Sequence, residues 1–590
     1  MQAATFHVAP SGNDANLGTP TAPLRTIQHA ADLAQPGDTI TVHEGIYRER
    51  IRPPRGGTSD SKRIVYQAAP GEKVVIKGSE AVTNWVNVQK DLWKATLRNS
   101  FFGGFNPYSD LIHGDWFDPM GREHHTGAVY LNGDWLIEAA TLDDVMKPIG
   151  SSGTLWFGQV DKENTTIWAQ FKGVNPNEQQ VEINVRQTVF YPEKTGIDYI
   201  TVRGFILEDA ATPWAPPTAE QIGLIGAHWS KGWIIENNVI RYSICSGISL
   251  GKYGDQWDNT SANTAEGYVK TIENALANGW SKENIGHHVV RNNTISDCGQ
   301  AGIVGSLGAA FSTITGNTIH DIHVRRLFGG AEMAGIKFHG AIDVQISRNH
   351  IYRTCRGLWL DWMAQGTRVT GNLFHDNDED VFVEVDHGPF LFDNNLLLSS
   401  LSLTDNSQGG AYAHNLFSGA IKMLPFDSRQ TPFLKAHSTA VAGYHDNPRS
   451  DNRFYNNLFV QRADLSEYDN AQLPVWMDGN VFLKGAKPSR HEKQPVVEPE
   501  FDPGIRLAGK ADGLYLEIKF DQAWNGEGTR KFVTTSLLGR AAIPDLPYEQ
   551  PDGSPIQINT DYFGRSRSNS HPTPGPFEDP GQGERTLKVW

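Results

Sequence analysis

Cysteine is scarce in this chain. Its 590 residues include only three, Cys245, Cys298 and Cys355. A count this small and odd excludes a disulfide framework and fits a reducing compartment. Each cysteine lies five to seven residues after an asparagine of the repeat described below, so we predict buried thiols near one corner of the fold.

Long hydrophobic runs are missing as well. No stretch of about 18 apolar residues occurs, which argues against a membrane-spanning helix and a membrane partner. Residues 1–5 lead straight into a strand pattern, without the basic segment and apolar segment of a secretion leader. We therefore expect a soluble, cytoplasmic protein, unless a signal segment has been removed from it.

Positive charge is the third shortage. The chain has 52 Lys and Arg against 67 Asp and Glu, a net charge of −15. This balance argues against a nucleic-acid partner and, more weakly, against a polyanionic substrate. Glycine, in contrast, is abundant at 59 residues, as a coil with many tight corners requires.

An asparagine recurs at nearly constant intervals over residues 238–480. Each is followed two positions later by an apolar residue, and five of the eight intervals are 20–24 residues long. A fixed period of this length is the signature of a solenoid. It predicts an all-β fold, a right-handed parallel β-helix, in which the asparagines stack as a structural ladder. The asparagines are Asn238, Asn293, Asn317, Asn349, Asn372, Asn395, Asn415, Asn457 and Asn480.

The pattern divides the chain into three parts. Residues 1–78 combine strands with a helical stripe at 24–34, which predicts a cap and the first coils of the β-helix. Residues 79–190 lack the asparagine repeat and carry short alternating runs around the turn Asn132-Gly133, which predicts an inserted β-sandwich domain. Residues 191–590 form the main parallel β-helix, with a helical excursion near 252–285 and a C-terminal closing segment.

Two carboxylates share one phase of the repeat. Asp361 and Glu384 each lie twelve residues after a repeat asparagine, and those two asparagines are 23 residues apart. One repeat per coil places the acids side by side on neighbouring parallel strands, about 4.8 Å apart at the backbone. Alternation along the strands sends the leucines and valines inward and Asp361, Glu384 and Asp386 outward.

An acidic pair on neighbouring strands calls for an explanation, because like charges side by side destabilise a sheet. One explanation is a solvated acidic face that tolerates the repulsion. The other is chemical: a retaining glycosidase uses two carboxyl groups about 5–5.5 Å apart, one as nucleophile and one as acid/base. We prefer the chemical explanation.

The sequence around the two acids is distinctive. The segments Gly357-Leu-Trp-Leu-Asp-Trp-Met-Ala-Gln-Gly366 and Asp380-Val-Phe-Val-Glu-Val-Asp-His387 resemble the active-site region of glycoside hydrolase family 120. The order of cap, insertion and β-helix also agrees with that family. The resemblance implies a retaining, exo-acting β-xylosidase that releases xylose from xylobiose and short xylo-oligosaccharides. It implies Asp361 as nucleophile, Glu384 as general acid/base and Glu332 as a carboxylate that hydrogen-bonds near the nucleophile. No cofactor and no metal are expected.

Other side chains near the acids are candidates for sugar contact. Each of them alone is equally well explained as a packing or surface residue, and strand parity turns one of the tryptophans, Trp362, toward the core. The candidates are Trp359, Trp362, Lys337, His339, Asp386 and His387.

Two other functions stay open. Polysaccharide lyases also use parallel β-helices, and here Lys337 or Arg356 would be the base while Asp361, Glu384 and Asp386 bind calcium. The acidic balance and the aromatic flanks favour a neutral sugar instead. A non-catalytic binding solenoid is the third possibility, and it leaves the acid pair without a purpose. Exo action needs a blocked groove, which the insertion, the excursion or a second subunit of a homo-oligomer would provide.

Overall fold

The computed structural model describes residues 3–150, 153–525 and 530–590. The chain forms two compact units. The first comprises residues 1–263, 293–305 and 322–333, and the second comprises residues 264–292, 306–321 and 334–590. Both consist mainly of stacked parallel strands, so the prediction of an all-β parallel β-helix with an inserted domain is confirmed. Among the described residues, no helix is long and apolar enough to cross a membrane.

The coils of the first unit stack their strands into three parallel sheets. Aliphatic side chains such as Val8, Ile40 and Ile64 point inward and are fully buried. Removing this apolar surface from water is the driving force for stacking the coils. One sheet holds β1 (Thr5–Val8), β2 (Thr39–Val42), β4 (Ile64–Ala68), β16 (Ile200–Arg203) and β19 (Ile234–Glu236). The next holds β3 (Gly45–Tyr47), β5 (Val74–Lys77), β17 (Ile206–Ala210), β20 (Val239–Ser243) and β23 (Thr294–Cys298). The third holds β18 (Ile225–Gly226), β21 (Ser246–Ser249) and β24 (Ala301–Ser306).

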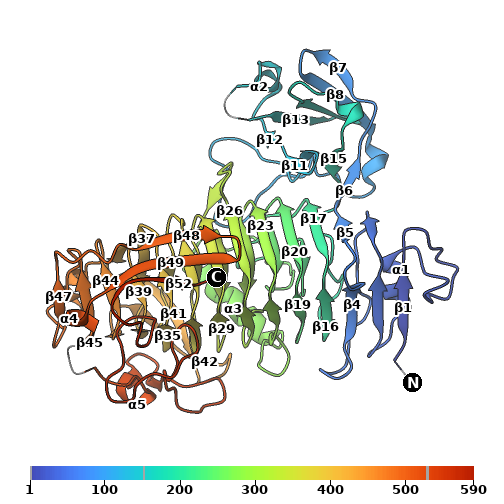
Figure 1. Ribbon diagram of the computed structural model, residues 1–590. Coiled ribbons are helices and arrows are strands. Elements are labelled where there is room, and N and C mark those ends of the chain that lie inside the picture. Colours follow the sequence, from blue (N-terminus) through green and yellow to red (C-terminus); the bar gives the residue numbers. More distant parts are fainter. Residues whose placement is uncertain (1–2, 151–152, 526–529) are drawn as a thin grey trace. The chain divides into compact units, whose positions relative to one another are not determined.

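The insertion of the first unit is a pair of mainly antiparallel sheets around an aromatic core. Trp85, Tyr108, Trp156 and Phe171 are buried together in this core. In Figure 1 its elements gather to one side of the first unit's coils, which they join at β6. One sheet holds β6 (Ser79–Ala81), β10 (Val129–Leu131), β11 (Asp134–Trp135) and β15 (Val181–Asn184). The other holds β7 (Val86–Gln89), β8 (Leu92–Arg98), β12 (Ile137–Glu138), β13 (Leu155–Val160) and β14 (Asn164–Gln170).

A buried charge cluster joins this insertion to the coils. The ammonium of Lys77 on β5 lies 2.5 Å from Glu182 of β15 and 3.1 Å from both Glu208 and Asp209 of β17. Asp209 also accepts a hydrogen bond of 2.7 Å from the hydroxyl of Ser79. Three carboxylates therefore share one central ammonium inside the fold, where an unpaired charge would be costly.

The second unit repeats the coil architecture with more strands. One sheet holds β22 (Val289–Arg291), β25 (Thr313–Thr315), β29 (Gln345–Ser347), β32 (Thr367–Thr370), β35 (Phe390–Asp393), β38 (Gly410–Ala413), β43 (Arg453–Tyr455) and β45 (Trp476–Asp478). The next holds β30 (His350–Thr354), β33 (Leu373–His375), β36 (Leu396–Leu397), β39 (Leu416–Phe417), β44 (Leu458–Val460), β46 (Val481–Leu483) and β47 (Val496–Glu498). The third, called the acid sheet below, holds β28 (Ala334–His339), β31 (Leu358–Asp361), β34 (Val381–Glu384), β37 (Leu401–Asn406) and β40 (Ala420–Met423).

The repeat asparagines form the predicted ladder. Asn349 donates from its backbone N–H and its side-chain amide to the Oδ1 of Asn372, at 2.9 and 3.0 Å, and Asn372 does the same to Asn395. The pattern continues to Asn480, whose amide donates to the buried carboxyl of Glu492 at 2.6 Å. Since every step also ties a side-chain amide to a backbone carbonyl, the ladder fixes the register of successive coils.

Several elements lie outside the stacked sheets of the second unit. Helix α3 (Ala265–Ala277), with Thr264 as its N-cap, lies within the helical excursion predicted near 252–285. The hairpin of β41 (Asp427–Leu434) and β42 (Val441–Asn447) contacts α3. Near the C-terminus β48 (Arg506–Lys510), β49 (Gly513–Phe520) and β52 (Gly583–Lys588) form an antiparallel sheet that runs across the coils of this unit (Figure 1).

The remaining elements are short. The first unit contains α1 (Ile27–Leu33), which confirms the helical stripe, and α2 (Leu142–Met146), while its strands β9 (Phe117–Asp118) and β27 (Gly329–Gly330) pair with each other. Others are η1 (Asn99–Phe102), η2 (Pro176–Glu178), β26 (Thr318–Ile322), η3 (Ser466–Asn470), α4 (Gln522–Asn525), α5 (Thr535–Leu538), β50 (Arg540–Ala541) and β51 (Leu546–Pro547).

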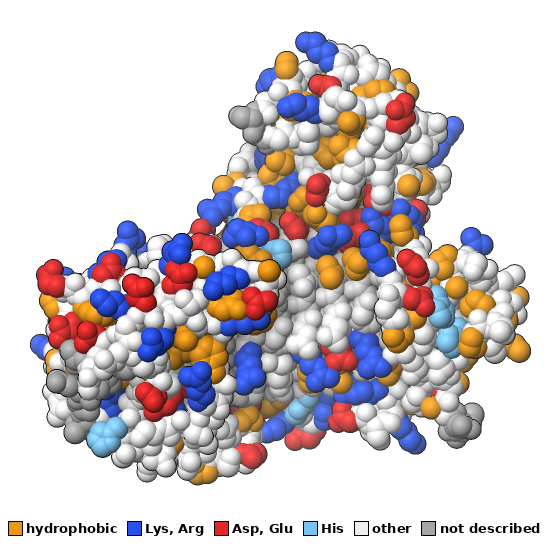
Figure 2. Space-filling view, viewed as in Figure 1, with side chains coloured by type: hydrophobic (Ala, Val, Ile, Leu, Met, Phe, Trp, Pro, Cys, Tyr) orange, Lys and Arg blue, Asp and Glu red, His pale blue; other side chains and the backbone are white. Residues whose placement is uncertain are grey.

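Charged side chains of both signs are mixed on the surface. On the face drawn in Figure 2, Lys and Arg side chains are interspersed with Asp and Glu rather than gathered into one patch of a single sign.

All three cysteines are free thiols. Cys245 and Cys298 are buried as predicted, whereas Cys355, in the corner that follows β30, is half-buried.

The charge cluster predicts a pH-dependent stability. Burial, followed by the neighbouring carboxylates, raises the pKa of Asp209 from 3.8 to about 6, although Lys77 opposes the shift. Between about pH 4 and pH 6 the folded protein therefore holds a proton that the unfolded chain releases, so this group's contribution to stability falls as the pH rises. The asparagine of the variant Asp209→Asn does not titrate in this range, so the variant lacks this pH-dependent contribution to stability. Its free energy of unfolding relative to the wild type is expected to rise by about 3 kcal/mol from pH 4 to pH 7.

Chemical denaturation at several pH values measures this difference. The matched control is Asp143→Asn, which removes an exposed aspartate of the same unit and should leave the difference from wild type independent of pH. A flat or falling difference for Asp209→Asn over the same range would contradict the assignment of this buried proton.

Candidate active site

Asp361 and Glu384 end two adjacent strands of the acid sheet. Strands β31 and β34 are parallel, and their register pairs Leu358 with Val381 and Asp361 with Glu384. The position predicted from the 23-residue repeat is confirmed. The aliphatic side chains between them, such as Leu360 and Val383, are fully buried in the coil, so the two acids project from the opposite side of the strands.

Asp361 is buried and has two basic neighbours on the preceding strand β28. The ammonium of Lys337 forms an ion pair with its Oδ2 atom, and the Nε2 atom of His339 lies 3.3 Å from the same oxygen. Lys337 is completely buried. A buried carboxylate with a charge partner and a ring nitrogen beside it is held in one orientation, as a reacting carboxylate must be.

The two basic neighbours have different protonation states. Burial, and then the positive charge of Lys337, lower the pKa of His339 to about 3, although Asp361 acts in the opposite direction. His339 is therefore a neutral imidazole at ordinary pH, and Lys337 supplies the positive charge next to Asp361.

Glu384 has a different counter-ion, which comes from the hairpin. Arg429 of β41 donates from Nη2 to the Oε1 of Glu384 at 2.7 Å and to the Oδ2 of Asp427 at 2.6 Å. The hairpin is fastened beside the strand, because the hydroxyl of Thr431 donates to the carbonyl of Val385 at 3.0 Å. Arg429 was missed by sequence reasoning, since it lies within the 42-residue interval in which the repeat is interrupted.

Asp386 departs from the predicted alternation. It is fully buried, and its Oδ1 accepts a hydrogen bond of 2.7 Å from the backbone N–H of Ala364. The expectation that it points outward with Glu384 is wrong, because Val385 has a left-handed φ of 52° that interrupts the strand alternation. Burial, and then the charges of Asp361 and Glu384, raise the pKa of Asp386 well above its usual range.

His387 is also buried and engaged by protein groups. Its Nδ1 lies 2.6 Å from the amide of Gln408, and its Nε2 lies 2.8 Å from the hydroxyl of Thr431. Burial lowers its pKa to about 4. His387 thus helps to fasten the hairpin to the coil. Sugar contact by Asp386 or His387 stays a prediction.

The two tryptophans of the predicted site occupy different surroundings. Trp359 has the ammonium of Lys337 3.4 Å and the guanidinium of Arg356 4.4 Å from its ring centroid. Among the described residues no atom accepts a hydrogen bond from its buried indole N–H. Since cations cover the ring of Trp359, the N–H is the group it offers to a ligand.

Trp362 does not follow strand parity into the core of the coil. It has a left-handed φ of 51° and packs edge-on against Tyr268 of helix α3, with ring centroids 5.0 Å apart. Tyr268 also contacts His339, at 4.8 Å. The helical excursion therefore packs against the residues beside Asp361, a contact that the periodicity of the coil alone does not predict.

Glu332 lies in the first unit and is buried. Its backbone carbonyl accepts a hydrogen bond of 3.1 Å from the amide of Gln300, which fixes this part of the loop before β28. Its role near the nucleophile stays a prediction.

Arg356 and Lys337, which the lyase alternative needs as a base, are both paired. Arg356 forms an ion pair of 3.0 Å with Glu379, and Lys337 is paired with Asp361 inside the fold. Because a base must be able to reach and accept a substrate proton, this arrangement does not favour the lyase.

Comparison with known proteins identifies relatives over the whole chain. The family model described as "Glycoside hydrolase 120, insertion domain" matches residues 82–183, and the model for a right-handed β-helix region matches residues 223–421. A model for a domain of unknown function matches residues 10–52. A solved structure, described as the complex structure of XylC with xylose, is 42% identical and superposes with a TM-score of 0.96. The match covers 99% of this chain and 100% of that one.

Two curated relatives match over a short segment only. The uncharacterized protein YwoF of Bacillus subtilis is 41% identical over 79 residues, which is 13% of this chain and 16% of YwoF. The pectate lyase PEL9 of Emericella nidulans is 41% identical over 80 residues, which is 13% of this chain and 19% of PEL9. The chain thus spans less than a fifth of the length of these curated relatives.

The buried pair of Lys337 and Asp361 predicts a large effect on stability. Lys337→Met leaves the carboxylate of Asp361 without its counter-ion inside the fold, which is expected to lower the free energy of unfolding by about 3–5 kcal/mol. The double variant Lys337→Met/Asp361→Leu removes both charges and should recover most of that loss. Thermal and urea unfolding of the three proteins measure the effect.

The control is Lys422→Met, which removes an exposed lysine from β40 of the same sheet. It should change stability by less than about 0.5 kcal/mol. If the double variant were no more stable than Lys337→Met, the coupling between the two charges would be disproved.

Proposed function

This chain belongs to glycoside hydrolase family 120, and on that premise we propose that it is a retaining, exo-acting β-xylosidase. Its substrates would be xylobiose and short xylo-oligosaccharides. The full-length similarity to XylC, whose solved complex contains xylose, supports xylose as the sugar. The observation that carries the proposal is the register of β31 and β34, which makes Asp361 and Glu384 neighbours on one sheet.

Asp361 is the proposed nucleophile. It has a short side chain, it is buried, and Lys337 and His339 both approach the same oxygen, Oδ2. The ammonium favours the ionised form that a nucleophile requires, because an opposite charge nearby stabilises a carboxylate. With Oδ2 occupied by these partners, Oδ1 is the atom we assign to the attack on the anomeric carbon.

Glu384 is the proposed acid/base, and Arg429 is its positioning residue. A glutamate has one more methylene than an aspartate, so from the neighbouring strand it can reach the leaving oxygen while Asp361 faces the anomeric carbon. Arg429 contacts both Glu384 and Asp427. It can therefore keep one carboxylate partner while Glu384 is protonated, which a single ion pair would not permit.

The reaction then proceeds in two displacements. In the first, Asp361 forms a bond to the anomeric carbon of the terminal xylose, while protonated Glu384 gives its proton to the departing glycosidic oxygen. In the second, ionised Glu384 takes a proton from water, the water oxygen bonds to the anomeric carbon, and the bond to Asp361 breaks. Both enzyme carboxyls regain their starting states, and xylose leaves in the β configuration.

Other residues would hold the sugar. The indole N–H of Trp359 is a buried donor beside Asp361 and suits a sugar hydroxyl. Lys337 and His339 border the same place. Glu332 as a third carboxylate near the nucleophile rests on the family resemblance. The substrate is a neutral sugar, so the reaction as proposed needs neither a cofactor nor calcium.

Loss and rescue of the nucleophile test its assignment. Asp361→Gly should lower the hydrolysis of xylobiose by about 10⁴-fold or more, which is the usual scale for losing a group that acts in covalent catalysis. Azide should restore part of the activity toward an aryl β-xyloside and yield xylosyl azide, because the small anion can occupy the space of the missing carboxylate. Product analysis by chromatography and NMR measures both effects.

The matched control is Asp512→Gly, which removes an exposed aspartate from the turn between β48 and β49 and should leave the rate unchanged. No xylose from the wild type, or unsaturated products from a uronate polymer only when calcium is present, would contradict the proposal. Inactivity of Asp361→Gly without any azide product would leave the nucleophile role unsupported and count against it.

Substrates with different leaving groups test the acid/base. Glu384→Ala should lose about 10³-fold on xylobiose but far less on an aryl xyloside whose phenolate leaves without protonation. Arg429→Lys keeps the positive charge but not the planar guanidinium, so its kcat/KM should lie between those of the wild type and Arg429→Ala. The measurement is kcat/KM for both substrates. Equal losses of Glu384→Ala on the two substrates would contradict the assignment of the proton donor.

A further inference from the structure

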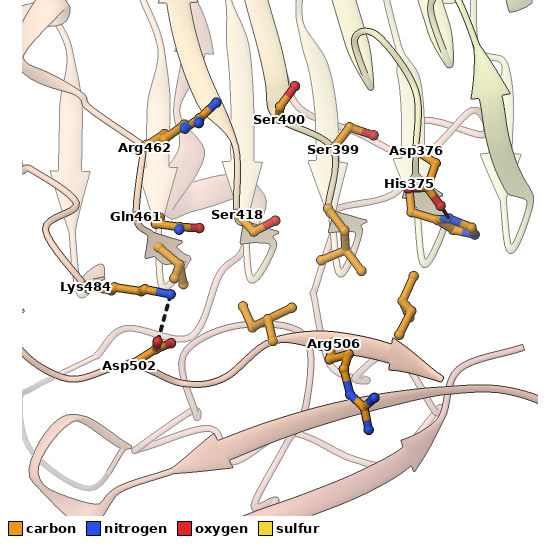
Figure 3. A pocket seen from close by; sticks show the side chains of 14 residues that line it. His375, Asp376, Ser399, Ser400, Ser418, Gln461, Arg462, Lys484, Asp502 and Arg506 are labelled. Carbon is orange, nitrogen blue, oxygen red and sulfur yellow. Dashed lines mark hydrogen bonds and ion pairs between the residues drawn. The ribbon is translucent and has the colours of Figure 1, made fainter. Parts of the chain in front are cut away.

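The second unit contains a cleft away from the acid sheet. Its volume is about 500 Å³, and its lining residues all belong to this unit. One wall consists of the corners that follow β33, β36, β39, β44 and β46, and the other wall is the segment 502–507 at the start of β48. Figure 3 shows the coil corners on one side of the gap and the C-terminal segment on the other, with Lys484 reaching across to Asp502. The cleft thus belongs to a different sheet from Asp361 and Glu384.

The coil wall offers polar groups at regular intervals. Neighbouring parallel strands lie about 4.8 Å apart, and each corner contributes at least one polar side chain, among them Ser400, Ser418, Gln461 and Arg462. Leu398 and the buried Val460 add apolar surface to this wall. A row of hydrogen-bonding groups with apolar side chains beside it matches a ligand that repeats in one direction and has both hydroxyl groups and C–H faces.

The opposite wall closes the cleft at one end. Lys484 of the coil and Asp502 of the C-terminal segment form an ion pair of 2.7 Å across the gap (Figure 3). Ile505 and Leu507 add apolar surface on this side. The cleft is therefore a channel with one bridged end and two unlike walls, rather than a flat surface.

The polar side chains of the cleft differ in whether other described residues engage them. Ser399 is engaged, because its hydroxyl accepts a hydrogen bond from the backbone of Asn377. In contrast, Gln461 and Arg462 are exposed, and their side chains make no hydrogen bond or ion pair within the described residues. An amide and a guanidinium beside each other can donate to several hydroxyl groups at once.

From this arrangement we infer an accessory, non-catalytic binding site for a linear oligosaccharide. The inference goes beyond the proposed function and rests on it only for the kind of sugar, a xylo-oligosaccharide longer than the dimer. Lys484 and Arg506 have carboxylate partners, Asp502 and Glu517. Paired charges with one unpartnered guanidinium suit a neutral, hydroxyl-rich chain better than a polyanion or a metal ion. The site would hold longer chains near the enzyme while their ends enter the active site.

Calorimetric titration of the Asp361→Asn variant with xylohexaose tests this inference. The variant does not consume the ligand, so two binding sites are expected, one at the acid sheet and one at the cleft. Adding Arg462→Ala should weaken the second site about tenfold, the scale of one charge-assisted hydrogen bond. Adding Ser400→Trp, which places a large ring at an exposed position of the coil wall, should abolish it.

The control is Lys493→Ala, an exposed lysine of the same unit that is not part of the cleft, which should leave both sites unchanged. Thermal unfolding checks that each variant is folded. If Ser400→Trp does not fold, Arg462→Ala still tests the inference. A single site in Asp361→Asn, or a second site that both cleft variants leave intact, would overturn the inference. Release of xylose by the wild type separates the two proposals. If no xylose were released, the proposed xylosidase function would be refuted, whereas the binding site in the cleft would not.

Discussion

The buried ladder of asparagine amides is the constraint on which the second unit depends. Each side chain links its own coil to the next one, and through backbone carbonyls also to the adjoining sheet. A slip of one residue in any coil would break these bonds and move the hydrophobic side chains to the wrong face. The same register brings Asp361 opposite Glu384. The chemistry of the acid sheet is therefore a consequence of how the coils are stacked.

The two acids differ in surroundings rather than in kind. Asp361 is deeply buried with Lys337 and His339 from the preceding strand, whereas Glu384 faces Arg429 from a hairpin that lies outside the coil. Two carboxyl groups with different catalytic roles need environments that push their pKa values apart. Here one environment comes from the repeating coil and the other from an interruption of it, so the regular and irregular parts of the chain each supply one half of the site.

Much of this arrangement could be predicted from sequence because it depends on local spacing. The coil period, the insertion, the helix at α3 and the pairing of Asp361 with Glu384 all follow from intervals along the chain. The buried position of Asp386 could not be predicted, since one left-handed residue, Val385, ends the alternation. Arg429 could not either, because 45 residues separate it from Glu384 and no periodicity connects them.

The most direct test of the account is to trap the covalent intermediate. A 2-fluoro xyloside with a good leaving group forms the glycosyl-enzyme faster than water releases it, because the fluorine disfavours the oxocarbenium-like transition states. Peptide mass spectrometry should find one fluoroxylosyl group on Asp361, and NMR of the ordinary reaction should detect β-xylose first. A label on another carboxylate, or α-xylose as the first product, would contradict the assignment of Asp361 as the nucleophile of a retaining enzyme.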